Sequence, residues 1–350
     1  MTMTECASCA DERAAGAAFC ESCGRSLAAG PACPHCGAAG AVGEDGYCEQ
    51  CGMLAARPRD HLEADAGDIA AAVTDRGLRH HRNEDSMWLA VRGGDVDVVV
   101  CDGVSSSFDP DVASATAAGA AGEALAAAGE TLTACGGKTV AADKTPAAGS
   151  TPAAEAPAAG EALAADVGAA ILAAKEAVAA LADDGDPRRA VSNPACTIVA
   201  AVVRGPQIAY GWIGDSRAYW VPLDGPAEQL TEDDSWATHV IALGVDPEVA
   251  MRDPKAHAIT GWLGADAGSV QPRGASFTVT EPGHLVLCSD GLWNYLTDPA
   301  AFAAAVRTGL HTHGTLINAA RYLTDYAINA GGADNITVAL IPVRPAPSEE

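Results

Sequence analysis

Four Cys-x-x-Cys pairs occupy the first 51 residues and constrain the folding of this chain more than any other sequence feature. Successive pairs are separated by ten, nine and eleven residues. The same segment holds almost no large apolar side chains, so a hydrophobic core alone cannot fold it and a cross-link is needed. Tetrahedral zinc bound by four thiolates supplies such a cross-link.

The sequential grouping of the cysteines predicts two structural zinc sites in a small domain at residues 1–55. One set comprises Cys6, Cys9, Cys20 and Cys23, and the other comprises Cys33, Cys36, Cys48 and Cys51. Glycine follows three of the pairs, where tight turns must direct backbone N–H groups at sulfur. The pattern resembles a double zinc ribbon. A disulfide framework is the alternative, and the absence of a signal-peptide pattern disfavours it.

The charge of the chain argues against binding to nucleic acid or to a membrane surface. It carries 46 acidic and 21 basic residues, a formal net charge of −25, and affinity for nucleic acid or anionic lipid depends on Lys and Arg. Residues 1–55 hold seven acids and two arginines, so we expect the ribbon to bind a protein partner of unknown identity. No basic region precedes an apolar core at the N-terminus, and no apolar run is long enough for a membrane span. We therefore expect a cytoplasmic protein.

Beyond the ribbon, the sequence predicts a linker at 56–67, a larger domain at 68–343 and a tail at 344–350. Seven runs rich in Val and Ile predict strands in the larger domain. They are 86–91, 95–101, 197–203, 207–213, 217–221, 284–288 and 335–341. Alanine-rich stretches predict helices at 111–133 and 160–181.

Two further segments complete this outline. The segment 134–159 is rich in proline and small residues that cannot form a core, so we expect it to be disordered. A late helix is expected at 314–330, with an apolar stripe that must face a sheet. The stripe is formed by Leu316, Ala320, Leu323 and Ala327. These features predict strands packed between outer helices.

Acidic residues lie at the ends of several predicted strands. Asp102 follows the run DVDVVVC, Asp290 follows HLVLC after one serine, and Asp334 stands just before ITVALI. Two more acidic groups lie at 83–85 and 214–217. Any one of them is explained equally well as a turn that ends a strand, but five such groups predict a shared site.

Oxygen ligands without histidine or thiolate are typical of Mg²⁺ or Mn²⁺ sites. Two such cations can share a bridging water, lower its pKa toward neutrality and neutralise phosphate oxygens during in-line attack. The chemistry indicated is hydrolytic phosphoryl transfer.

The order of the motifs RGLRHHRNED, VVCDGVSSS, IGDSRAYW, VLCSDGLW and GADNITVALI resembles the metal-dependent Ser/Thr protein phosphatases, the protein phosphatase 2C family, over about 68–343. The resemblance implies an α+β fold: an antiparallel β-sandwich flanked by helices on both outer faces. It implies hydrolysis of phosphoserine and phosphothreonine on protein substrates of a Ser/Thr kinase. The nucleophile would be a hydroxide that bridges two Mn²⁺ or Mg²⁺ ions.

The resemblance also implies the ligands of the first ion. Asp102 would bridge both ions, and the carbonyl oxygen of Gly103 would ligate one of them. Asp290 and Asp334 would complete the first ion. All three aspartates are therefore expected to be catalytic residues.

The remaining acids would serve the other ions. Glu84 would ligate the second ion directly or through water, with Asp85 beside it as support, and both are expected to be catalytic. Asp215 and Asp290 would hold a third, weaker ion of the kind seen in bacterial relatives.

Three positions depart from the family pattern. His80 occupies the position of the arginine that grips substrate phosphate. Strand-like alternation would place His80 and Arg82 on one face and Arg79 on the other, so Arg82, or His80 itself, is expected to bind phosphate. No histidine follows Gly103 to act as a general acid, so water must protonate the leaving group. Asp234 replaces the histidine of the LTxDHS segment that begins the family's flap.

Two other functions are compatible with parts of the sequence. A catalytically weak, phosphatase-like module that binds phosphoproteins is motivated by the missing arginine and the serine-rich turn after Asp102. A zinc protein that binds nucleic acid is disfavoured by the charge. Mn²⁺-dependent hydrolysis of an aryl phosphate separates an active enzyme from the binding module.

The cysteine pattern predicts the metal content of the chain. Zinc analysis of the purified protein is expected to find about two ions per chain, because each group of four thiolates fills one tetrahedral site. A peptide of residues 1–55 is expected to unfold when the zinc is chelated. Intact disulfides without zinc would contradict the ribbon assignment.

Overall fold

The structure is a computed structural model that describes residues 8–15, 17, 20–22, 32–33, 36–43, 46–53, 55, 57–135 and 159–347. The chain forms two compact units, Met1–Pro58 and Arg59–Glu350. Most of the segment predicted to be disordered, 134–159, lies outside the described residues. Its two ends are helical, because helix α2 extends to Cys135 and helix α3 begins at Ala159.

The larger unit contains two sheets whose strand pairs, within the described residues, are antiparallel. A six-stranded sheet has the order β1-β2-β11-β10-β7-β8, and a five-stranded sheet has the order β3-β4-β5-β6-β9. The strands are β1 His61–Asp65, β2 Ala71–Asp75, β3 Ser86–Arg92, β4 Asp95–Cys101, β5 Ile198–Arg204, β6 Gln207–Ile213, β7 Arg217–Pro222, β8 Glu228–Gln229, β9 Arg273–Thr278, β10 Gly283–Cys288 and β11 Ile336–Val343.

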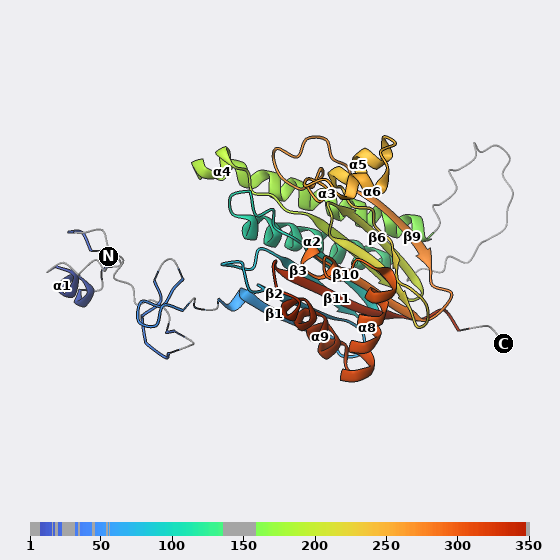
Figure 1. The fold of residues 1–350 in the computed structure, drawn as a ribbon, viewed down its shortest axis with the longest axis horizontal. Coiled ribbons are helices and arrows are strands. Elements are labelled where there is room, and N and C mark those ends of the chain that lie inside the picture. Colours follow the sequence, from blue (N-terminus) through green and yellow to red (C-terminus); the bar gives the residue numbers. More distant parts are fainter. Residues whose placement is uncertain are drawn as a thin grey trace. The chain divides into compact units, whose positions relative to one another are not determined.

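The longer helices cover the outer faces of the sheets (Figure 1). Helices α2 and α3 pack on the five-stranded sheet, and helices α8 and α9 pack on the six-stranded sheet. The helices are α1 Cys9–Ala14, α2 Pro110–Cys135, α3 Ala159–Ala180, α4 Pro187–Val191, α5 Trp236–Ala242, α6 Pro247–Met251, α7 Asp290–Trp293, α8 Pro299–His313 and α9 Leu316–Asn329, with 3₁₀ turns at Pro58–Asp60 and Leu181–Asp183. None of the helices in the described ranges combines the length and apolar character needed to cross a membrane.

Three apolar layers hold this unit together. The middle layer lies between the sheets and is filled by valines, isoleucines and leucines of both, including Val98 and Leu285. Each outer layer lies between one sheet and its pair of helices. The alternation of side chains along each strand supplies both faces of each sheet, so the strands are apolar on both sides. The prediction of an antiparallel sandwich with helices on both outer faces is confirmed.

The predicted strands and helices of the sandwich are confirmed, with boundaries shifted by at most two residues. The late helix is α9, and all four residues of its predicted stripe are buried against the sheet. The linker predicted at 56–67 is wrong, because β1 lies within it and pairs with β2. The side chains of this edge strand are mostly polar and exposed, so the sequence shows no apolar pattern there.

Strands β2, β8 and β9 and helix α8 were also missed. Strand β2 is buried up to its last residue, Asp75, but is rich in alanine, which has a low strand propensity. Strand β8 has two residues, and β9 is an exposed edge strand. Helix α8 did carry signals in the sequence: Asp298 caps its N-terminus, Pro299 is its first residue, and Gly314 ends it in a left-handed conformation.

The outer layer under α8 offers a test of the packing. The ring of Phe302 is fully buried and stacks on Tyr219 with 4.1 Å between ring centroids. Phe302→Ala is expected to lower the free energy of unfolding by about 3–5 kcal/mol, because it leaves a cavity between helix and sheet. Leu243→Ala, at a side chain that is 73% exposed, serves as the control and is expected to change it by less than about 0.5 kcal/mol. Urea denaturation measures both, and equal effects would contradict this packing.

Candidate functional site

The five acidic groups predicted from the sequence meet at one end of the sandwich. Asp102 follows β4, Asp215 follows β6 and Asp290 begins α7 directly after β10. Glu84 precedes β3, and Asp334 precedes β11. In an antiparallel sheet the end of one strand lies beside the beginning of its neighbour, so these termini share one rim.

Electrostatic coupling shows that the carboxylates act on one another. Burial raises the pKa of Asp102 well above its ordinary range, and repulsion from Asp85, Asp290, Asp334 and Asp215 raises it further. Each of these four aspartates lies at the end of a different strand. Two of the strands, β10 beside Asp290 and β11 beside Asp334, are neighbours in one sheet. The structure therefore brings together the aspartates that the sequence placed at separate motifs.

Other members of the cluster are perturbed in the same direction. Burial, followed by repulsion from Asp290, raises the pKa of Asp215 to about 8. Burial raises the pKa of Asp85 to about 7, and burial and the charge of Asp334 raise that of Asp290 to about 6. Anionic carboxylates at such a rim are unfavourable unless a positive charge compensates them.

The residues present fit hard divalent cations. Oδ1 of Asp290 and Oδ1 of Asp85 are buried and have no hydrogen-bond partner among the described residues. Their neighbours offer carboxylate oxygens, which are the ligands that Mg²⁺ and Mn²⁺ prefer. Within the described ranges, only a cysteine group brings three or more ligand atoms within 4.8 Å of one another, so the carboxylates are more widely spaced.

Asp85 is fixed by hydroxyl groups of the six-stranded sheet. Its Oδ2 accepts hydrogen bonds from Ser289 Oγ at 2.8 Å and Thr337 Oγ1 at 2.7 Å. Ser289 Oγ also accepts the N–H of Thr337 at 2.9 Å. Asp85 therefore ties the start of β3 to β10 and β11 through Oδ2, while its Oδ1 has no partner among the described residues. The sequence analysis did not single out Ser289 or Thr337, since no local pattern marks them.

Close backbone approach explains the glycines of the two Asp-Gly pairs. A Cβ atom at Gly103 would lie 2.7 Å from the carbonyl oxygens of both Glu84 and Pro110. A Cβ atom at Gly291 would overlap the carbonyl oxygen of Asn335. Only glycine lets these segments approach so closely, and the approach brings Asp102 near Glu84 and Asp290 near Asp334.

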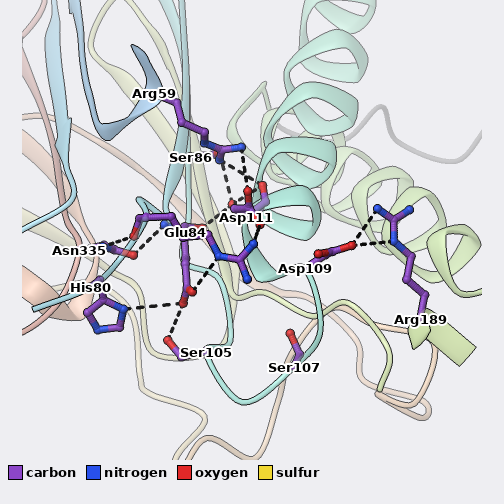
Figure 2. A network of polar contacts seen from close by, with 12 residues as sticks. Arg59, His80, Glu84, Ser86, Ser105, Ser107, Asp109, Asp111, Arg189 and Asn335 are labelled. Carbon is purple, nitrogen blue, oxygen red and sulfur yellow. Dashed lines mark hydrogen bonds and ion pairs between the residues drawn. The ribbon is translucent and has the colours of Figure 1, made fainter. Parts of the chain in front are cut away.

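Glu84 lies at the centre of a polar network (Figure 2). Its Oε2 accepts a hydrogen bond from Ser105 Oγ at 2.6 Å, and its backbone N–H donates to Asn335 Oδ1 at 2.7 Å. Arg82 Nε lies 3.4 Å from Glu84 Oε1, and His80 Nδ1 lies 3.9 Å from Glu84 Oε2. Both predicted phosphate-binding side chains thus flank the carboxylate of Glu84.

The strand-based argument about His80 and Arg82 is wrong. Residues 77–82 form a turn and a bend rather than a strand, so side chains do not alternate between two faces there. His80 Nε2 pairs with Asp334 Oδ1 at 3.0 Å, and this hydrogen bond raises the pKa of His80. Arg82 donates to Asp111 Oδ1 at 2.8 Å at the start of α2. Both side chains consequently reach the acidic rim from the same turn.

The region around Asp215 contains contacts that the sequence did not predict. Trp293 is buried, and its Nε1 donates to the backbone carbonyl of Asp215 at 2.9 Å. The guanidinium of Arg217 stacks on the Trp293 ring at 3.5 Å and forms a bidentate pair with Asp233 at 2.7 and 2.8 Å. Trp293 lies three residues after Asp290, so it connects the segments that carry Asp290 and Asp215.

A second candidate site lies in the smaller unit. The Sγ atoms of Cys33, Cys36, Cys48 and Cys51 all lie within 4.8 Å of one another. Two of the Sγ–Sγ distances are 3.7 Å, close to the roughly 3.8 Å between ligands of tetrahedral zinc with Zn–S bonds of about 2.3 Å. That spacing is far longer than a disulfide bond of about 2.05 Å. The four thiols therefore fit zinc.

The two halves of this cysteine group have matching backbone turns. Gly37 N–H donates to Cys33 O, and Gly52 N–H donates to Cys48 O, both at 2.8 Å. Backbone N–H groups, that of Cys51 first, lower the pKa of Cys48 to about 7, which favours a thiolate ligand. In the other predicted group, Cys9 and Cys20 are buried together. Cys6 and Cys23 lie outside the described residues.

Comparisons with known proteins identify the family of the larger unit. A family model described as protein phosphatase 2C matches residues 78–321, more than half of the chain. The serine/threonine phosphatase stp of Listeria innocua is 33% identical over 146 residues, which cover 41% of this chain. The chain spans about half the length of the curated relatives that it matches, 55% in this case.

Solved structures share the fold. The serine/threonine phosphatase PstP/Ppp of Mycobacterium tuberculosis is 25% identical, with a TM-score of 0.55, and the match covers 79% of this chain and 98% of that one. The catalytic domain of PstP in complex with two manganese ions is 24% identical, with a TM-score of 0.52 over 78% of this chain and 97% of that one. The match with the latter bears on the fold alone.

The raised pKa values predict how the metal-free protein responds to pH. A carboxyl group whose pKa rises from 3.8 to about 8 in the folded state, as at Asp215, binds its proton more tightly when folded. The stabilisation that this bound proton gives to the folded state is fully present below pH 3.8, the pKa in the unfolded chain, and is lost as the pH rises through about 8, the pKa in the folded state. Protein freed of Mn²⁺ and Mg²⁺ but still loaded with zinc is therefore expected to be more stable to urea at pH 5.5 than at pH 8.5. Asp215→Asn is expected to reduce this difference, and an unchanged difference would contradict the assignment.

Proposed function

Because the chain belongs to the protein phosphatase 2C family, we propose that it is a metal-dependent protein phosphatase that hydrolyses phosphoserine and phosphothreonine. The observation that carries the proposal is the convergence of five acidic segments on one rim of the sandwich, with partnerless carboxylate oxygens on Asp290 and Asp85. The names of the relatives, which are serine/threonine phosphatases, support the choice of substrate.

In this proposal Asp102, the Gly103 carbonyl, Asp290 and Asp334 hold one Mn²⁺ or Mg²⁺ ion, and Asp102 and Glu84 hold another. Bound ions would lower the pKa of a water molecule and neutralise the phosphate oxygens of the substrate. Asp215 and Asp290 together would hold a third and weaker ion.

The neighbouring side chains of this chain orient the site. Asp85 is held by two hydroxyl groups and keeps the start of β3 against β10 and β11. Ser105 holds the carboxylate of Glu84 through a 2.6 Å hydrogen bond. These contacts keep the ligands in place before substrate arrives, so less reorganisation is needed during turnover.

His80 and Arg82 are the groups proposed to bind the substrate phosphate. Each already lies beside a carboxylate, His80 at Asp334 and Arg82 at Asp111, which neutralises part of its charge. Both side chains flank Glu84 on the turn that reaches the rim. Since Val104 rather than histidine follows Gly103, solvent water would supply the proton for the leaving alkoxide.

The smaller unit is proposed to bind two zinc ions and to dock a protein partner. The geometry of Cys33, Cys36, Cys48 and Cys51 supports zinc in one of the two sites. Seven acids against two arginines in residues 1–55 favour a protein partner over nucleic acid. Thiolate ligands require reduced cysteines, so we propose that the protein functions in the cytoplasm.

Replacing a proposed ligand tests the function. Asp290→Asn is expected to lower the Mn²⁺-dependent kcat/KM for a phosphothreonine peptide by about 100-fold or more, because it removes a charged ligand from a site for several cations. The zinc content and the fold are expected to remain, since the side chain lies at the rim. Asp325→Asn, at an exposed residue of α9, is the control and is expected to leave turnover unchanged.

Turnover is measured across a Mn²⁺ titration. Equal activity of Asp290→Asn and wild type at every Mn²⁺ concentration would show that Asp290 is not a catalytic ligand. A wild-type protein that binds the phosphopeptide but never hydrolyses it would favour the phosphoprotein-binding module.

A further inference from the structure

The turn that carries Asp215 is held by a side chain from a distant segment. Gly214, directly before Asp215, donates its N–H to Asp234 Oδ2 at 2.8 Å. In return, the backbone N–H of Asp234 donates to the carbonyl oxygen of Gly214 at 2.9 Å. Asp234 therefore forms hydrogen bonds with this turn through both its side chain and its backbone.

The second carboxylate oxygen of Asp234 is also occupied. Arg273, at the start of β9, donates to Asp234 Oδ1 at 2.6 Å. The same guanidinium binds the carbonyl and the side chain of Glu232 at 2.6 and 2.8 Å, and it lies over the ring of Trp212. Since both carboxylate oxygens have partners, Asp234 differs from the rim aspartates with a partnerless oxygen and is not itself suited to ligate an ion.

Asp234 also stands where the two ends of a surface segment meet. We define the flap as residues 235–263, which contain α5 and α6. Thr260 N–H donates to the carbonyl oxygen of Asp234 at 2.7 Å, and Ser235 pairs with Ile259 as an isolated bridge. A Cβ atom at Gly261 would lie 3.0 Å from the Asp234 side chain. The entrance and the exit of the flap are thus both packed on this one residue.

From these contacts we propose that Asp234 is a positioning residue: its hydrogen bond to Gly214 sets the place of Asp215 for ion binding and couples that place to the flap. The inference rests on the proposed function, because it assumes that Asp215 ligates a cation. Arg273 orients the Asp234 carboxylate so that one oxygen faces the turn.

Two other arginine–acid pairs lie nearby, but neither of them holds the turn at Gly214. Arg217 and Asp233 form their own bidentate pair on the Trp293 ring, and neither side chain bonds to Gly214 in the contacts of the described region. Glu232 shares Arg273 with Asp234, but its side chain is 68% exposed and is directed at the guanidinium alone. Glu232 therefore offers a matched control that perturbs Arg273 without touching the turn.

Calorimetric titration of the zinc-loaded, full-length protein with Mn²⁺ tests the proposal. Asp215→Asn first identifies the Mn²⁺ site that depends on Asp215. Asp234→Ala is expected to weaken that same site by about tenfold or more and to change the other sites by less than about threefold, as expected for a residue that orients a ligand. Glu232→Gln is expected to leave all sites within about twofold of wild type.

A conservative variant separates geometry from charge. Asp234→Asn keeps a carbonyl oxygen for the Gly214 N–H, so it is expected to retain affinity within about threefold of wild type. In the double variant Asp215→Asn/Asp234→Ala, no further loss beyond that of Asp215→Asn is expected, because both changes act through one ligand. Affinities equal to wild type in Asp234→Ala, or equal losses in Asp234→Asn and Asp234→Ala, would overturn the proposal.

Hydrogen exchange on the wild type provides a measurement that needs no variant to fold. Coupling between two sites is reciprocal, so Mn²⁺ at the Asp215 site is expected to slow exchange of the Gly214 and Thr260 amides. Unchanged exchange of both amides at saturating Mn²⁺ would contradict the coupling. These readouts do not depend on turnover: an inactive wild type would reject the proposed phosphatase, while the titration would still decide the role of Asp234.

Discussion

Mutual repulsion among carboxylates at one rim of the sandwich is the constraint that the neighbouring structure must balance. Burial and charge raise the pKa values of Asp85, Asp102, Asp215 and Asp290 together, so the cluster opposes folding whenever its members are ionised. The three apolar layers offset this unfavourable term, because they bury both faces of both sheets far from the rim. The apolar sandwich therefore supplies the stability that lets acids gather at its end, and cations would remove the repulsion.

The acids are held in place by neutral groups rather than by opposite charges alone. Hydroxyl groups of Ser289 and Thr337 hold Asp85, a serine hydroxyl holds Glu84, and the indole of Trp293 holds the backbone of Asp215. Such donors fix a carboxylate without neutralising it, so its charge stays available to a cation. Arg217 and Arg273 pair with Asp233 and Asp234, which neighbour the proposed ligand Asp215, whereas Arg82 lies beside the proposed ligand Glu84 itself.

The two units illustrate two ways in which a chain of this composition can fold. The larger unit has long Val- and Ile-rich strands and folds around its own core. In the smaller unit, the four thiols of the described cysteine group stand at distances suited to tetrahedral zinc, and matching turns place the N–H groups of Gly37 and Gly52 on the carbonyl oxygens of Cys33 and Cys48. Zinc bound there would take the place of a core, which fits the scarcity of large apolar side chains in that segment.

The sequence by itself determined the central strands, the long helices and the identity of the acidic motifs, because buried strands and amphipathic helices leave periodic apolar patterns. It did not reveal β1 or β9, whose exposed edges leave no such pattern, and it misjudged the turn at 77–82 as a strand. Only the tertiary structure decided which groups hold each acid in place. The hydroxyl groups of Ser289 and Thr337 hold Oδ2 of Asp85, and Asp234 reaches Gly214 across 20 residues of chain. Contacts between strands distant in sequence depend on sheet order and register, and a local pattern of residues carries neither.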